Sequence, residues 1–290
     1  MIVVLQWWIH PTATAKRPRL RNRAGSRRMD CFALTLFSLL AYTHTAAAQP
    51  TALDIMTRVN ERDTGHSETA NLEMVLEDSG GRQRRRSLKS FSRDIKGSSQ
   101  NIIFFLAPAN LKDTAFLTYD YEDPNHDDDQ WLYLPALRRT KRIAGGDRSD
   151  SFMGSDFSYA DMTTRPLNRY TYSIMKETTV HGTPVWQIEA IPNEEETKET
   201  GYTRSILFVR QDNYVPIRGV NWVKKGRKLK YFDVERLELI DGIWVASQIS
   251  MTTKKGKKTL HRTRISRENV TFNQPLDARL FTVRSLERGI

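Results

Sequence analysis

The feature that most constrains the fold of this chain is a long succession of short β-rich runs joined by turn residues. Asp241-Gly242 lies between two apolar residues, Ile240 and Ile243, and Gly tolerates the positive φ that a two-residue hairpin turn requires. Further turns of this kind are His181-Gly182, Asp212-Asn213, Lys225-Gly226 and Lys255-Gly256. Eleven or twelve strands are expected, at residues 72–77, 82–92, 102–106, 116–121, 131–134, 170–176, 185–191, 204–210, 215–223, 229–239, 244–253 and 259–269.

Successive hairpins make an antiparallel sheet, and no strand–helix–strand alternation interrupts them, which disfavours a parallel α/β enzyme fold. The main helical pattern is at residues 52–62, where Leu53, Met56 and Val59 have helical spacing after a predicted N-cap at Thr51. The predicted fold is therefore mainly β: one large curved antiparallel sheet forming a half-open barrel, capped by one or a few short helices.

Residues 1–48 have the pattern of a secretory signal. A basic stretch at residues 16–28 precedes an apolar segment at residues 31–42 and the small residues Ala46-Ala47-Ala48. The apolar segment has about a dozen residues, whereas a membrane-spanning helix needs roughly 20. We expect cleavage between Ala48 and Gln49 and a periplasmic mature protein, with Met1 and Met29 both open as the start.

Charge and cysteine content restrict the function of residues 49–290. The chain has a net charge of +11, but residues 1–48 hold seven Lys or Arg and one Asp, so the remainder carries about +5. Acidic groups such as residues 127–129 and 194–196 interrupt the basic residues, which argues against a nucleic-acid track. The single cysteine, Cys31, lies in the leader, so a core must stabilise the mature chain without disulfides. One domain is expected over residues 49–290.

Catalytic and metal signatures are weak in this sequence. No zinc-protease, nucleophile-elbow, Walker or dinucleotide motif occurs, and Gly154-Ser155-Asp156 lacks the geometry of an elbow. The loop at residues 123–134 resembles an EF-hand at its first positions, but Asp128 replaces the required Gly and Leu134 the bidentate Glu. We expect a solvated acidic turn, no metal, no cofactor and no enzymatic activity. The histidines, His261 among them, are expected to be solvated surface residues.

Two segments indicate binding. Residues 130–137 are mostly apolar, which indicates a strand buried on both faces or one that lines a ligand cavity. The basic residues that follow, Arg138, Arg139, Lys141 and Arg142, form either a solvated strand or a site for an anionic headgroup or an acidic partner. Residues 148–166 place aromatic and Met side chains among Gly, Ser and Asp, as in a loop that plugs a core or acts as a lid.

Two motifs in these segments, DQWLYLPALRR at residues 129–139 and SFMGSDFSYADM at residues 151–162, resemble those of outer-membrane lipoprotein-sorting proteins, a group similar in fold to the carrier LolA. Looser similarity is present at residues 115–119 and 280–282. The resemblance implies a half-open β-barrel with helices over its mouth that accepts acyl chains. It also implies pairing with an exporter of the resistance-nodulation-division type.

The expected function is that of a monomeric periplasmic carrier of lipoprotein acyl chains or another lipid toward the outer membrane. The alternatives are an accessory module of such an exporter without its own cargo and, third, a periplasmic hydrolase. Candidate lid residues are Phe152, Met153 and Phe157. Candidate lipid-binding residues, whose strand face is open because side chains alternate, are Leu72, Met74, Leu76, Ile103, Phe105, Trp131 and Tyr133.

Overall fold

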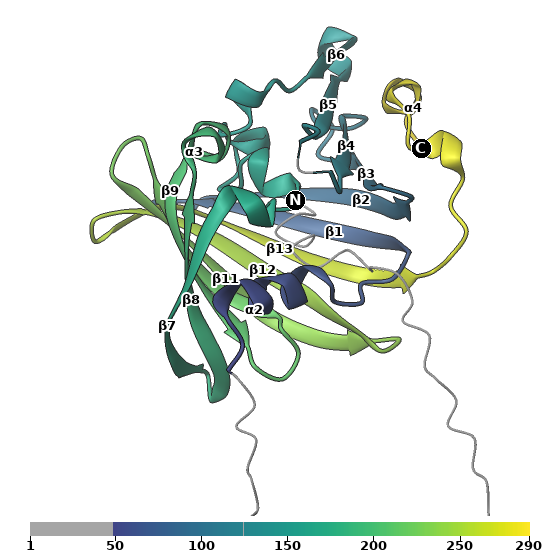
Figure 1. The fold of residues 1–290 in the computed structure, drawn as a ribbon. Coiled ribbons are helices and arrows are strands. Elements are labelled where there is room, and N and C mark those ends of the chain that lie inside the picture. The colour runs from purple at the N-terminus through teal and green to yellow at the C-terminus, as the bar shows by residue number, and fades with distance from the viewer. Residues whose placement is uncertain (1–48, 124) are drawn as a thin grey trace, which may run out of the picture. The chain divides into compact units, whose positions relative to one another are not determined.

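One sheet of thirteen antiparallel strands dominates the protein (Figure 1). The computed structural model describes residues 49–123 and 125–290, so the expected leader and its cleavage site lie outside the described residues. The strands are β1 (Ser67–Asp78), β2 (Gln83–Ile95), β3 (Ser98–Ala107), β4 (Ala115–Tyr121), β5 (Asp129–Leu134), β6 (Arg139–Arg142), β7 (Tyr170–Val180), β8 (Thr183–Pro192), β9 (Tyr202–Arg210), β10 (Pro216–Val223), β11 (Lys228–Ile240), β12 (Ile243–Lys255) and β13 (Lys258–Phe272).

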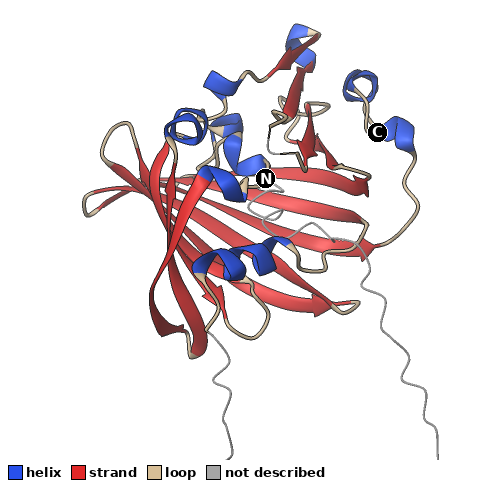
Figure 2. Ribbon diagram, in the orientation of Figure 1, coloured by secondary structure: helices blue, strands red, loops and turns tan. Residues whose placement is uncertain are grey.

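The order across the sheet is β6-β5-β4-β3-β2-β1-β13-β12-β11-β10-β9-β8-β7. Every neighbour is consecutive in the chain except β1 and β13, which pair in the middle with Met74 opposite Ile265. Figure 2 shows the strands as one curved sheet, whose edge strands β6 and β7 do not pair with each other. The predicted mainly-β, half-open architecture is confirmed.

Tight turns connect the strands as the sequence predicts. His181 and Gly182 have φ values of 50° and 81°, and Asp241 and Gly242 have 51° and 82°. Positive φ at both central residues defines the two-residue turn whose twist matches that of the flanking strands. The predicted hairpins β7–β8 and β11–β12 are therefore confirmed.

The two faces of the sheet bury different sets of side chains. The face that carries the larger apolar cluster, which includes Leu72, Met74 and Phe105, is called the inner face. The outer face carries a smaller cluster, in which Phe104 of β3 packs with Phe281 and Leu286 from the C-terminal segment. That segment contains α4 (Val283–Arg288) and covers the outer side of β4 and β5.

Helix α2 (Ala52–Asn60) covers part of the inner face. Thr51 caps it: its hydroxyl accepts from the Asp54 amide, and the Asp54 carboxylate accepts from the Thr51 amide. The helix buries Ile55, Met56 and Val59 in the inner cluster and contacts β7. The predicted helix and its N-cap are confirmed, with an end two residues earlier than expected.

The short helices α3 (Glu194–Thr200) and α4 have no counterpart among the sequence predictions, and β6 is the solvated strand that was one of the two expectations for the basic residues after β5. All are brief, and α3 is highly charged, so hydrophobic periodicity is weak in each. Of the helices in the described ranges, none has the length and apolar character needed to cross a membrane.

Candidate functional site

The inner face of the sheet is crossed by residues 143–169, which we call the crossing segment. This segment joins β6 to β7, the strands at the two opposite edges of the sheet, so its chain has to traverse a face to connect them. It consists of loops and four 3-10 turns: η2 (Gly145–Asp147), η3 (Phe152–Gly154), η4 (Ala160–Met162) and η5 (Leu167–Arg169). Phe152, Phe157 and Met162 belong to the inner cluster, which places the segment on the inner face.

Five of the seven predicted lipid-binding residues come together beneath this segment. Leu72, Met74 and Leu76 lie at alternate positions of β1, and Ile103 and Phe105 at alternate positions of β3. All five belong to the inner cluster and are at most 4% exposed. The period-2 alternation of a strand thus produces one continuous apolar surface.

Trp131 and Tyr133 lie elsewhere. Both belong to the outer cluster, where Trp131 packs edge-on against Tyr119 with 5.1 Å between the ring centroids. Leu132, between them in β5, occupies the inner face instead. The expectation that all seven side chains share one surface is therefore wrong for Trp131 and Tyr133, because β5 is apolar on both faces and only its pairing decides which face each residue takes.

The candidate lid residues are inserted into the apolar inner surface. The ring centroid of Phe152 lies 6.2 Å from that of Phe105 and 5.1 Å from that of Phe116. Phe152 and Phe157 are fully buried, and Met153 is half-buried against the same cluster. A tight turn delivers the two rings: the Phe152 amide donates to the Phe157 carbonyl at 2.8 Å, with Met153 in the left-handed region at φ 50°.

A buried carboxylate fastens this turn to the sheet. Asp156, 2% exposed, accepts hydrogen bonds from the hydroxyls of Thr253 (2.5 Å) and Thr263 (2.8 Å) and pairs with the His261 ring. The Thr263 oxygen also accepts from the Asp156 amide at 3.0 Å. His261 is exposed at the surface, as expected, and its ring nitrogen also contacts this buried carboxylate.

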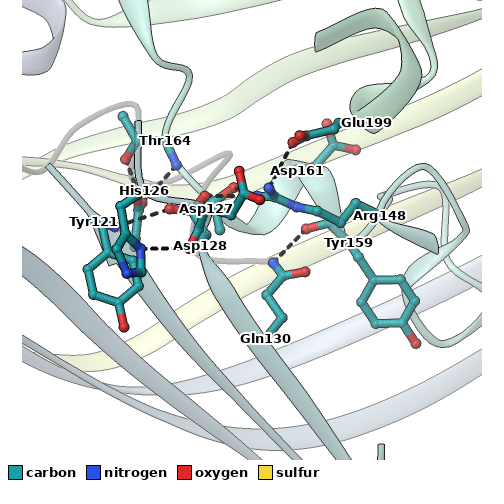
Figure 3. Close-up of polar contacts among 12 residues, drawn as sticks. Tyr121, His126, Asp127, Asp128, Gln130, Arg148, Tyr159, Asp161, Thr164 and Glu199 are labelled. Atoms are coloured by element: carbon teal, nitrogen blue, oxygen red, sulfur yellow. Dashed lines mark hydrogen bonds and ion pairs between the residues drawn. The ribbon is translucent and has the colours of Figure 1, made fainter. Parts of the chain in front are cut away.

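A second anchor holds the crossing segment near the acidic loop before β5 (Figure 3). Arg148 is paired with Asp128 at 2.8 Å and with Glu199 of α3 at 2.9 Å, and it donates to the Thr163 hydroxyl at 2.6 Å. Burial opposes the charge of this guanidinium, but the two carboxylates outweigh burial and raise the pKa of Arg148. In addition, Gln130 of β5 donates to the Tyr159 carbonyl at 2.9 Å.

The acidic loop itself is part of this anchor. Asp128 is largely buried by its pairing with Arg148, so the expected solvated turn is wrong for this residue. Next to it, burial and the charge of Asp128 raise the pKa of Asp120 well above its usual range, although the Thr164 amide and hydroxyl each donate to Asp120 at 2.7 Å. No group of three or more His, Cys, Asp or Glu side chains in the described part of the chain is placed to hold a metal ion.

Only part of the basic cluster after β5 is free to bind an anionic headgroup or an acidic partner. Lys141 pairs with Asp147 at 2.8 Å, and Arg142 pairs with Asp129. Arg138 and Arg139 are exposed. Two of the four predicted headgroup or partner residues are therefore neutralised within the chain.

Sequence reasoning missed the polar anchors altogether. Asp156 pairs with a residue 105 positions away, and Arg148 with one 51 positions away, so no local pattern reveals either contact. The one available signal is compositional: the motif at residues 151–162 places two Asp among aromatic residues, where a simple hydrophobic plug would have none.

The open antiparallel sheet, the helix on its inner face and the inserted loop make up a LolA-like fold. A protein-family model described as "Uncharacterized protein" matches residues 97–288, and the chain belongs to that family. No curated protein matches the chain.

Solved structures are similar to this chain over most of its length. A DUF1329 family protein from Desulfovibrio piger matches with a TM-score of 0.74 and 29% identity over 81% of this chain and 97% of the other. A "putative outer membrane lipoprotein-sorting protein domain" from Vibrio parahaemolyticus matches with a TM-score of 0.74 and 28% identity, covering 82% and 98%. A LolA superfamily protein from Nitrosomonas europaea shares the fold, with a TM-score of 0.62 and 17% identity over 82% and 100%.

Proposed function

We propose that this protein is a periplasmic carrier that binds acyl chains on the inner face of its sheet, for traffic of lipoprotein or another lipid toward the outer membrane. The observation that carries the proposal is the insertion of Phe152 and Phe157 into the apolar inner surface from a loop held by polar anchors. A plug built this way can leave as a unit, because its rings are delivered by one turn. The likeness to a lipoprotein-sorting domain supports the same reading.

The energetics favour exchange of the plug for cargo. Burial of a Phe side chain contributes about 1.5–3 kcal/mol, so withdrawal of Phe152 and Phe157 costs roughly 3–6 kcal/mol. An acyl chain gains about 0.8 kcal/mol for each CH₂ group removed from water, so roughly eight buried CH₂ groups offset that cost. Burial of a long acyl chain therefore contributes more free energy than withdrawal of the two Phe side chains costs. The empty carrier is thus protected from aggregation by its own plug, and the loaded carrier by its cargo.

In this proposal Leu72, Met74, Leu76, Ile103 and Phe105 contact the acyl chain, and Phe152, Met153 and Phe157 are displaced by it. The protein is non-enzymatic, forms a single domain over residues 49–290 after cleavage near Ala48, works as a monomer, and receives or delivers cargo at an exporter of the resistance-nodulation-division type. Trp131 and Tyr133 have no contact with cargo, since the outer cluster holds them.

Lipid extracted from protein purified out of the periplasm, identified by mass spectrometry, tests this directly. A fluorescent acyl probe tests the mechanism: Phe152→Ala removes a competitor and should increase probe affinity. The matched control is Phe281→Ala, since Phe281 is 1% exposed and packs on the outer face. Protein that is always empty and takes up no probe would refute carriage and favour the accessory module. Asp127→Ala with Asp129→Ala should leave binding intact, whereas a hydrolase would lose activity.

A further inference from the structure

Arg86 is a buried cation on the inner face without a carboxylate partner. Its residue is 7% exposed, the same value as Arg148. Arg148 pairs with two carboxylates, whereas the one side-chain hydrogen bond of Arg86 within the described residues is to the Met74 thioether, at 3.7 Å. A guanidinium removed from water without a counter-charge is costly, so a buried one is normally paired.

The surroundings of Arg86 are positive. Burial lowers the pKa of Arg86, and the neighbouring charge of Arg84 lowers it further. The carboxylate of Asp156 in the crossing segment is engaged by Thr253, Thr263 and His261 on β12 and β13. The electrostatics of this position therefore favour an added anion.

This pair of cations lies at one end of the apolar surface. In β2 the inward-facing positions run Arg84, Arg86, Leu88, with Leu88 opposite Leu72 of β1 and Arg86 opposite Met74. Same-face residues of a strand are about 7 Å apart, so Arg86 is one such step from the apolar residues beneath Phe152. An acyl chain in the place of the plug would have its polar end within reach of Arg86.

The sheet end to which Arg84 and Arg86 belong is strongly basic. The turns β1–β2, β12–β13 and β10–β11 lie at the same end, because Asp78 pairs with His261 and Leu229 with Lys254. Residues 82–86, 224–228 and 254–258 each contain four Lys or Arg and no acid. Such a concentration of charge attracts anions toward this end of the inner face.

We propose that Arg86, with Arg84 beside it, binds the anionic head of the carried lipid, a phosphate or carboxylate, so that the cargo is an anionic and not a neutral lipid. The inference rests on the proposed function, since the acyl chain must lie on the inner face for its head to reach Arg86. A planar guanidinium fits an oxyanion by two parallel hydrogen bonds. The burial cost of Arg86 is then offset only in the loaded state.

The experiment compares fluorescent phosphatidic acid with the diacylglycerol of identical chains, in phosphate-free buffer. The wild-type protein should bind phosphatidic acid at least about tenfold more tightly, as expected for a charge-assisted contact. Arg86→Met should remove this preference and leave diacylglycerol binding unchanged. Arg85→Met is the matched control, because Arg85 is adjacent but exposed and paired with Glu73. Equal affinities for both lipids in the wild-type protein would overturn the proposal while leaving carriage intact.

Two further measurements separate the remaining outcomes. Arg86→Met should also raise the melting temperature, since a buried unpaired charge is replaced by an apolar side chain of similar length. If Arg86→Met does not fold, Arg86→Gln replaces it in the lipid-binding measurements. Inorganic phosphate alone should stabilise the wild-type protein and not Arg86→Met. Stabilisation by phosphate with no preference for phosphatidic acid would overturn the lipid-head assignment and support a free-phosphate site. If neither lipid binds, carriage fails, and the phosphate measurement still decides whether Arg86 is an anion site.

Discussion

Asp156→Asn is the substitution that most directly tests whether the crossing segment competes with cargo. The carboxylate accepts from two buried threonine hydroxyls, Thr253 at 2.5 Å and Thr263 at 2.8 Å. A hydrogen bond to a charged group contributes roughly 1 kcal/mol more than one to a neutral group, so loss of the charge weakens the anchor by about 2 kcal/mol. His261 adds little to this figure because half of its side chain is exposed.

A weakening of about 2 kcal/mol increases the population of the released segment by roughly 30-fold. If the acyl probe binds only when the segment is released, its apparent Kd falls by up to the same factor. Hydrogen exchange of the amides at residues 151–159 reports the release, and fluorescence titration reports the Kd. Asp150→Asn is the control, since Asp150 is an exposed carboxyl of the same segment. Faster exchange with an unchanged or higher Kd would refute competition between plug and cargo.

Three further predictions test the fold and its electrostatics. Phe104→Ala and Phe105→Ala should each cost about 3–5 kcal/mol in urea unfolding, but only Phe105→Ala should change probe affinity, because the adjacent rings lie on opposite faces. Burial raises the pKa of Asp94 to about 7, so between pH 4 and 7 the unfolded chain releases a proton that the folded one keeps, and stability falls as pH rises. Asp94→Asn should flatten that fall and add about 4 kcal/mol at pH 8, and equal pH profiles would contradict it. Gly242→Ala should cost about 1 kcal/mol because Gly242 has a φ of 82°, whereas Gly145→Ala, at ordinary φ, should cost little.

Local chemistry explains the parts of the fold that the sequence predicts well. Turns such as Asp241-Gly242 depend on the backbone freedom of two residues, and the capping of α2 depends on Thr51 and Asp54 three positions apart. The alternation in β1 likewise needs only neighbours in the chain. These signals were sufficient for a mainly-β meander and for the grouping of Leu72, Met74 and Leu76.

Tertiary structure decided the rest. The pairing of β1 with β13 joins residues about 200 positions apart, and it determines which end of the sheet gathers the basic turns. Strand β5 is apolar on both faces, so only its pairing with β4 assigns Trp131 to the outer cluster and Leu132 to the inner one. From the sequence alone, a charged residue is expected to be solvated, and only the tertiary structure shows whether it is buried.

The sequence by itself therefore predicted most of the apolar half of the candidate site, with Trp131 and Tyr133 as the exceptions, and left its polar half undefined. The strand pattern and the aromatic motif at residues 151–162 were enough to predict a sheet and a loop that either plugs its core or acts as a lid. The anchors at Asp156 and Arg148 follow from contacts between distant segments, and the burial of Arg86 without a carboxylate partner follows from the packing of the inner face. Hydrophobic periodicity is a property of neighbours in the chain, whereas the partner of a buried charge is chosen only when the chain folds.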